Sequence, residues 1–247
     1  MPAHRFLSTF CHLRTAALSL AVALFALYGC ADYDDGPESA QPTVTNIVTF
    51  MGNNPQGLAT FHFYPAGTAT PLELTADRPL DSEAADFPCL ATYIPLSGEP
   101  LASGPVMLLS CSIINDIHAE TVPLDRFNAW WDATPLTVRS LWAAGPYINL
   151  DCLIPYGEAA RDLRFFILEV TDPDSGEELT DLDSYDAFIA HRADTGPTFD
   201  RQYYISFDLR DFLDSHPRVS SLRVHVNDAA AASSPAIFVI TIPRAAL

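Results

Sequence analysis

The chain has 247 residues, of which 31 are Asp or Glu and 13 are Lys or Arg, so its formal net charge at pH 7 is −18. All the basic residues are arginine. A field this negative repels phosphate groups, which argues against nucleic acid and anionic lipid headgroups as partners. The acidity instead favours solubility and the attraction of cations.

The amino terminus has the pattern of a targeting segment. Arg5 and Arg14 precede an uncharged apolar run over residues 16–28. The sequence LYGC then ends at Cys30. As a helix this run covers about 20 Å, short of the roughly 30 Å of a hydrocarbon core. We therefore expect residues 1–29 to be a lipoprotein signal peptide that is cut before Cys30. The alternative is an ordinary secretory signal with an incidental Cys30, because Tyr28 is atypical at its position.

Lipid on Cys30 predicts a membrane-anchored protein. A diacylglyceryl thioether plus an amide-linked acyl chain such as palmitate would bury more than one chain, which is enough for durable anchoring. Residues 30–41 are acidic and then rich in Pro, Ser and Thr, and we expect a flexible tether there. The acidic residues resemble signals that send some lipoproteins to the cell surface, although a solvated spacer explains them equally well. The predicted location is the outer membrane, with the periplasmic and surface-exposed sides both open.

Residues 42–122 are expected to form a small β domain similar to an OB barrel. Short strand-like stretches, separated by looser sequence, lie at residues 44–50, 60–64, 89–94 and 106–114. Four or five strands in about 80 residues suit a small barrel, although pattern alone does not separate a barrel from a sandwich. Residues 125–132 mark the junction with the next module, and we expect one of the adjacent Trp130 and Trp131 to pack there.

Residues 123–247 are expected to form an antiparallel β-sandwich. Leu222, Val224 and Val226, for example, alternate with polar residues, which is typical of a strand with one buried face. Residues 211–216 could add one helical turn. Seven strands separated by Gly, Pro and Asp turns favour a sandwich, giving an all-β protein. They are expected at residues 137–142, 148–154, 163–170, 185–192, 204–209, 222–226 and 237–242.

Three cysteines remain after removal of the signal and lipidation of Cys30. Because three is odd, at most one internal bridge can form, and Cys89–Cys111 is the pair to test. Cys152 alternates in phase with apolar neighbours, which predicts a core thiol rather than a catalytic one. No C-x-x-C motif suggests a metal or redox site.

Residues 172–178, with the sequence DPDSGEE, contain the best candidate for a cation site. Asp172, Asp174 and Glu177 lie around Gly176, and carboxylates at such positions can wrap calcium. The segment lacks the third acidic position and the spaced bidentate glutamate of a full calcium loop. The simpler interpretation is a hairpin turn with Gly176 at positive φ, and no metal is expected.

Three segments of the second half resemble the signature of NigD-like lipoproteins. They are residues 141–150 (LWAAGPYINL), 190–194 (AHRAD) and 204–209 (YISFDL), in the expected order. Pro146 stands where that family more often has an acidic residue. The resemblance implies a lipobox, an OB-like domain and a β-sandwich. It implies no catalytic residue, because the family has no settled biochemical activity.

Residue patterns of enzymes are absent from the sequence. No H-E-x-x-H or G-x-S-x-G occurs, and a carboxylate pair nominated from 31 acids carries almost no information. We therefore expect a non-enzymatic envelope module that binds a glycan or another envelope protein. No cofactor is expected. The alternative is a hydrolase of envelope or dietary polymers with an unrecognised carboxylate site. Phe61, Phe63, Tyr64 and Tyr93 could stack on sugars, although strand aromatics are more often core.

Overall fold

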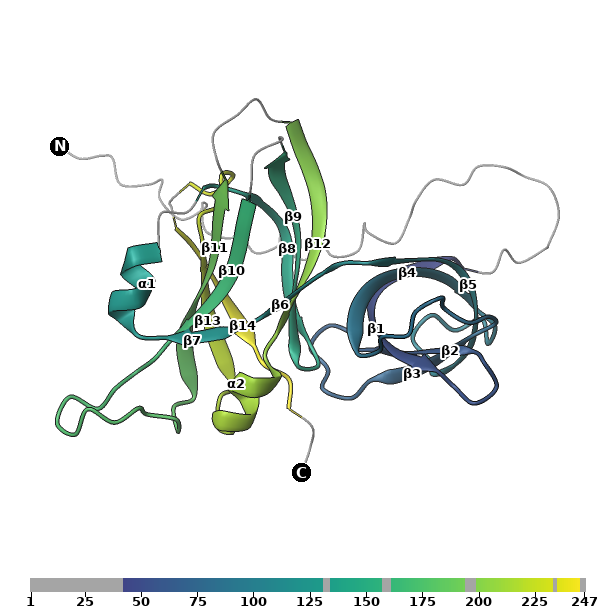
Figure 1. Ribbon diagram of the computed structural model, residues 1–247, viewed down its shortest axis with the longest axis horizontal. Coiled ribbons are helices and arrows are strands. Elements are labelled where there is room, and N and C mark those ends of the chain that lie inside the picture. The colour runs from purple at the N-terminus through teal and green to yellow at the C-terminus, as the bar shows by residue number, and fades with distance from the viewer. Residues whose placement is uncertain (1–41, 131–133, 157–160, 194–198, 233–234, 245–247) are drawn as a thin grey trace, which may run out of the picture. The chain divides into compact units, whose positions relative to one another are not determined.

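The computed structural model describes residues 42–130, 134–156, 161–193, 199–232 and 235–244 (Figure 1). The signal peptide, Cys30, the tether and Trp131 lie outside these residues. Within them, no helix is long and apolar enough to cross a membrane.

Five strands close into a barrel in the order β1-β2-β3-β5-β4 (Figure 1). Only β3 and β5 pair in parallel. The expected strands are confirmed, and β3 is an addition, because its short alternation of Leu72, Leu74 and Ala76 lay where looser sequence was expected. The barrel strands are β1 (Val44–Asn53), β2 (Ala59–Phe63), β3 (Leu72–Ala76), β4 (Phe87–Pro95) and β5 (Gly104–Ile113).

Two sheets form the second part of the fold, in the orders β14-β13-β11-β10-β7 and β6-β12-β9-β8. All seven strands expected there are present. They are β8 (Thr137–Ala144), β9 (Tyr147–Tyr156), β10 (Arg161–Leu168), β11 (Ser184–Ala193), β12 (Phe199–Asp208), β13 (Ser221–Val226) and β14 (Ala236–Thr241). The structure thus confirms an all-β fold of a small barrel followed by a sandwich.

The sandwich sheets are mixed rather than purely antiparallel. Strands β6 (Asn115–His118) and β7 (Glu120–Val122) run parallel to β12 and β10, and β11 runs parallel to β13. Parallel neighbours need a crossover, and the chain between β11 and β13 makes one through β12 and the helix α2 (Arg210–Ser215). The chain joins the sandwich at Asn115, before residue 123. The number of independently folding domains stays a prediction.

Each part of the fold has its own apolar core. Phe50, Phe61 and Tyr93 lie inside the barrel, and Phe165 stacks on Phe207 between the two sheets with ring centroids 4.7 Å apart. A fully buried Leu, Ile or Phe side chain contributes about 1.5–3 kcal/mol. The alternation seen in the sequence therefore places the stabilising residues correctly.

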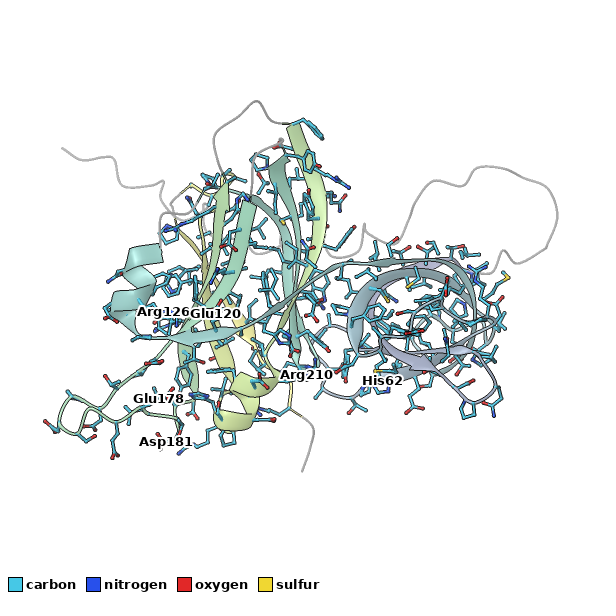
Figure 2. All side chains as sticks on the ribbon, viewed as in Figure 1. His62, Glu120, Arg126, Glu178, Asp181 and Arg210 are labelled. Carbon is cyan, nitrogen blue, oxygen red and sulfur yellow. The ribbon has the colours of Figure 1, made fainter. Side chains whose placement is uncertain are left out.

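The segment expected to be the module junction forms the helix α1 (Leu124–Trp130) on the outer face of a sheet. Its Phe127 ring lies 4.1 Å from that of Phe188 and 6.2 Å from that of Phe166. Arg126 pairs with Glu120 of β7 at 3.5 Å beside the helix (Figure 2). These contacts give α1 a covering role for β10 and β11.

Candidate functional site

A cavity of about 450 Å³ opens between the two sheets, where the chain enters the sandwich along β6. This volume lies in the range of small-molecule sites, about 300–1,000 Å³. Half of the lining is aliphatic, and the other half carries polar groups. The aliphatic residues are Ile114, Ile117, Ile154 and Leu163, and the polar ones are Asn115, Asp116, His191 and Tyr203.

The cavity walls come from five strands, β6, β9, β10, β11 and β12, mostly at inward-facing positions. Ile154 of β9 and Leu163 of β10 continue the apolar rows that form the sandwich core. Tyr203 is in phase with the buried Ile205 of β12, and β6, paired to β12, closes the side. The alternation that builds the core thus also aims these side chains into the cavity.

Asp116 of β6 lies at the rim of the cavity, and its register opposite Ser206 places its side chain on the barrel-facing side of the sheet with Asp208 and His118. Burial raises the pKa of its carboxyl above the ordinary value, and the nearby carboxylates of Asp208 and Asp86 raise it further. His118 and Arg210 act in the opposite direction without cancelling the effect.

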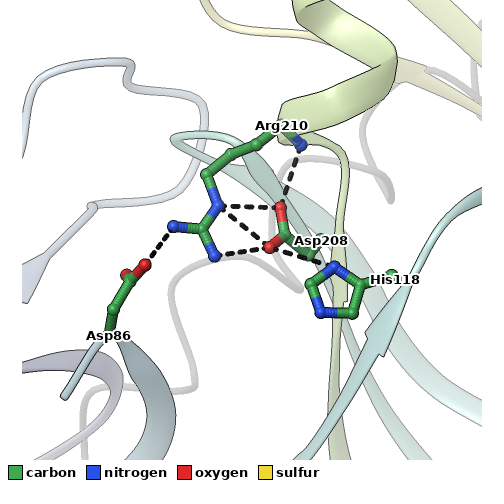
Figure 3. A network of polar contacts seen from close by, with 4 residues as sticks. All are labelled: Asp86, His118, Asp208 and Arg210. Carbon is green, nitrogen blue, oxygen red and sulfur yellow. Dashed lines mark hydrogen bonds and ion pairs between the residues drawn. The ribbon is translucent and has the colours of Figure 1, made fainter.

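Asp208 and Arg210 form a tightly bonded pair between His118 and Asp86 (Figure 3). The Nε of Arg210 donates to both carboxylate oxygens of Asp208, at 3.1 and 2.9 Å, and its Nη2 donates at 2.6 Å. The Asp208 side chain is 2% exposed, and His118 Nδ1 lies 3.5 Å from it. Arg210 also pairs with Asp86 of the barrel. The guanidinium of Arg210 thus pairs with two carboxylates, those of Asp208 and Asp86.

The barrel and the sandwich meet along a seam formed by the β8–β9 hairpin and the loop after β2. Gly67 N donates to Ala143 O, and Gly145 N donates to Thr68 O, both at 2.8 Å. The ring of Tyr64 packs over Gly145 and lies 6.4 Å from that of Tyr147. Two backbone hydrogen bonds and two ring contacts therefore involve the segment 141–150, so this part of the sequence has a structural role at the seam.

Polar groups at the seam are also satisfied internally. Ser206 Oγ donates to Asn149 Oδ1 at 2.6 Å, and both residues are buried. The guanidinium of Arg210 lies 5.7 Å from the ring centroid of Tyr147. A cavity of about 10 Å³, lined in part by His62 of the barrel (Figure 2), has room for about one water molecule. The seam is therefore packed and offers no space for a ligand.

The structure brings the candidate disulfide partners together as free thiols. Ala91 faces Cys111 across β4 and β5, which makes Cys89 and Cys111 diagonal neighbours. A hydrogen bond from Cys89 to Cys111 raises the pKa of the Cys89 thiol and lowers that of Cys111. Cys152 is buried in the sandwich core, as expected. Bridging of Cys89 and Cys111 stays a prediction.

The candidate calcium segment folds back on itself as a turn. Asp172 Oδ1 accepts the backbone N–H groups of Asp174 and Ser175 at 2.8 and 2.9 Å, and Gly176 has φ +72°. These bonds hold the pKa of Asp172 below its ordinary value. Within the described parts of the chain, no group of three or more His, Cys, Asp or Glu side chains is placed to hold a metal ion. The carboxylates of Asp172, Asp174 and Glu177 are thus not brought together.

The aromatic residues proposed as a sugar platform belong to the barrel core or the seam. Phe61, Phe63 and Tyr93 are buried, and Tyr64 packs against the hairpin. The alternative interpretation, that strand aromatics are core, is the correct one here. Sequence reasoning missed Asp116, because a single acid in an irregular stretch gives no signal before the facing strands are known.

No protein-family model and no curated protein matches the sequence. Among solved structures, a protein of unknown function from Bacteroides vulgatus matches with 11% identity over 82% of this chain and 92% of that chain, at a TM-score of 0.62. A Bacteroides fragilis protein provisionally named a lipoprotein matches with 16% identity over 83% and 100%, at a TM-score of 0.55. These similarities show a shared fold of barrel and sandwich.

A NigD-like immunity protein from Bacteroides caccae is also similar, with 15% identity over 79% of this chain and 90% of that chain, at a TM-score of 0.49. The two neighbours from B. vulgatus and B. fragilis share the barrel-and-sandwich fold that the resemblance to NigD-like lipoproteins implies. The chain therefore has the architecture of a class of β proteins whose members include proteins of unknown function.

Proposed function

We propose that this protein is a non-enzymatic binding module of the cell envelope and that the cavity between the sandwich sheets is its binding site. The cavity is the observation that carries the proposal, because its volume of about 450 Å³ and its mixture of aliphatic and polar walls suit a small ligand. Asn115, His191 and Tyr203 supply the few polar groups that orient a ligand in such sites.

The location proposed for this module is the outer membrane, with lipid on Cys30 as the anchor. The uncharged apolar run, the LYGC sequence and the acidic tether support this proposal. A neighbour provisionally named a lipoprotein has the same fold. The physiological partner proposed for this module is a glycan or another envelope protein, and binding assays should screen both classes.

The chemistry of the cavity supports binding rather than catalysis. Its described lining has no Ser, Thr, Cys or Lys side chain that a base could activate as a nucleophile. A hydrolase would need a second working carboxylate beside Asp116, and Asp208 is the nearby candidate. Because Asp208 is 2% exposed and bonded by Arg210, it is poorly placed to reach a substrate.

A neutral apolar probe tests the binding proposal. The mature chain, residues 30–247 with Cys30→Ser to keep it free of lipid, should bind n-octanol in saturation-transfer NMR. Ile114→Trp, at the cavity lining, should abolish this binding, and near-ultraviolet circular dichroism should show that the variant is folded. Equal octanol binding by both proteins, or none by the parent, would contradict the proposed site.

The anchor is tested separately in cells. The full chain should take up an alkyne analogue of palmitate and fractionate with outer membranes, whereas Cys30→Ala should do neither. A variant that keeps both properties would refute lipidation at Cys30.

A further inference from the structure

We propose that the cavity between the two sheets takes a small amphiphilic carboxylate, with its apolar body between the sheets and its anionic group on the guanidinium of Arg201. This inference rests on the proposed binding function and names the chemistry of the ligand. It follows from the register of β9 on β12, the contacts of Arg201 and the walls of the cavity.

Arg201 lies on the inner face of its sheet, beside the cavity. In the antiparallel pair of β9 and β12, Arg201 is opposite Ile154, and Tyr203 is opposite Cys152. Directly opposite residues share one face of a sheet, with Cβ atoms about 5 Å apart. Because Ile154 and Cys152 belong to the sandwich core, the side chain of Arg201 starts from the core-facing side. Its neighbours Ile154 and Tyr203 are both walls of the cavity.

Two tyrosine rings hold the guanidinium at this position. The Cζ atom of Arg201 lies 5.1 Å from the ring centroid of Tyr156 and 5.4 Å from that of Tyr203. The ring of Phe199 lies 5.2 Å from that of Tyr156 and continues this surface along β9 and β12 to the end of the sandwich distant from α2 (Figure 1). These cation–π contacts restrict the side chain of Arg201 without using its N–H donors in hydrogen bonds.

Arg201 keeps a positive charge that no carboxylate neutralises within the described residues. Its side-chain contacts there are the two tyrosine rings, with neither a hydrogen bond nor an ion pair from the guanidinium. Other arginines of this acidic chain, such as Arg164 and Arg223, pair with carboxylates. The adjacent acid, Asp200, lies on the opposite face of β12, because side chains alternate along a strand. The planar guanidinium fork matches a carboxylate through two parallel hydrogen bonds, so a carboxylate is the group we expect it to bind.

The walls of the cavity set the rest of the ligand. Ile154 and Leu163 come from opposite sheets, and Ile117 closes the side along β6. A hydrocarbon body among these side chains is favourable because its apolar surface leaves water. Asp116 at the rim turns toward the barrel, away from this interior. The net charge of −18 acts over a distance and is screened by physiological salt beyond about 8 Å, whereas the contact with Arg201 is direct.

Three probes with the same eight-carbon chain and different head groups test the assignment. Isothermal titration calorimetry on the mature lipid-free chain should show n-octanoate binding about fivefold more tightly than n-octanol, the upper range for an exposed ion pair. n-Octylammonium should bind no more tightly than octanol. In NMR spectra, the Nε–H signal of Arg201, identified by its absence from Arg201→Gln, should shift with octanoate and stay in place with octanol.

Arg201→Gln should remove the preference for octanoate and leave octanol binding unchanged, which also shows that the variant is folded. Arg218→Gln is the matched control, because it removes the same charge from an exposed turn outside the cavity lining and should keep the preference. Equal binding of octanoate and octanol by the parent, or a preference that survives in Arg201→Gln, would overturn the carboxylate assignment, while octanol binding would still support the cavity as a site. If none of the three probes binds, the proposed binding function itself fails.

Discussion

Replacing Gly145 by alanine should weaken the seam between the barrel and the sandwich by about 3.5 kcal/mol. Gly145 has φ +58°, where a side chain costs about 1–2 kcal/mol. A Cβ atom there would also lie 2.6 Å from Cγ and Cε1 of the Tyr64 ring, which must shift. Forcing extra atoms into a packed contact costs about 1–3 kcal/mol. Adding the midpoints of the two ranges, about 1.5 and about 2 kcal/mol, gives the expected loss in the free energy of unfolding.

Urea unfolding followed by circular dichroism measures this loss, and Gly57→Ala is its matched control. Gly57 has φ +77° in the β1–β2 turn, but a Cβ atom there would meet nothing within 4 Å. The control should therefore lose only the cost of positive φ, about 1–2 kcal/mol. In a Tyr64→Ala background, Gly145→Ala should cost no more than Gly57→Ala. If Gly145→Ala is as mild as the control in the parent protein, the close contact with Tyr64 is not a structural constraint.

Three further predictions concern thiols and buried charge. Iodoacetamide should alkylate Cys111 well before Cys152 at neutral pH, and peptide mass spectrometry measures the two rates. A hydrogen bond from the neighbouring thiol lowers the pKa of Cys111, whereas burial raises the pKa of Cys152 to about 12. Equal rates of alkylation would contradict this. For Asp186, burial raises the pKa, but hydrogen bonds from two side chains of β13 outweigh it and leave the pKa below the unfolded value of 3.8. The stability that Asp186 contributes is therefore full above about pH 4 and is lost as the pH falls below it. Asp186→Asn should destabilise the protein at pH 6.5 and much less at pH 3. A loss of stability that does not depend on pH would refute the pairing. Arg210→Ala should lower the free energy of unfolding in urea by about 3 kcal/mol, more than Asp208→Asn does. The alanine variant leaves the buried charge of Asp208 unpaired, whereas the asparagine variant removes that charge. The reverse order would show that Asp208 is hydrated.

Period-two alternation predicted the sheets well because one face of each strand is buried in the fold's own core. The same pattern misled where a second surface covers the outer face. Ser206 and Asp208 alternate with Ile205 and Phe207, and the pattern places them in water. Both are buried in the structure, since the seam with the barrel covers this end of β12. Alternation along one strand holds no information about such a cover.

The helix α1 and the candidate site were beyond sequence reasoning for related reasons. Phe127 is the one buried side chain among those described on α1, and a single anchor gives no helical periodicity. The cavity gathers residues from β6, β9, β10, β11 and β12. Ile154 and Leu163 were expected as ordinary core residues. Whether such residues touch each other or leave a space depends on the distance between the sheets, which no local pattern encodes.

The signature segments and the cavity occupy largely different residues, and this separation explains why the resemblance predicts the fold without a ligand. Gly145, Tyr147 and Asn149 of the first segment serve the seam through backbone, ring and buried hydrogen-bond contacts. Of the cavity lining, only His191 falls within a signature segment, and Asp116 lies outside all three. A chain can therefore keep the contacts that join barrel to sandwich while the residues that line the cavity change. Chains that share this seam are expected to differ in the ligand they bind.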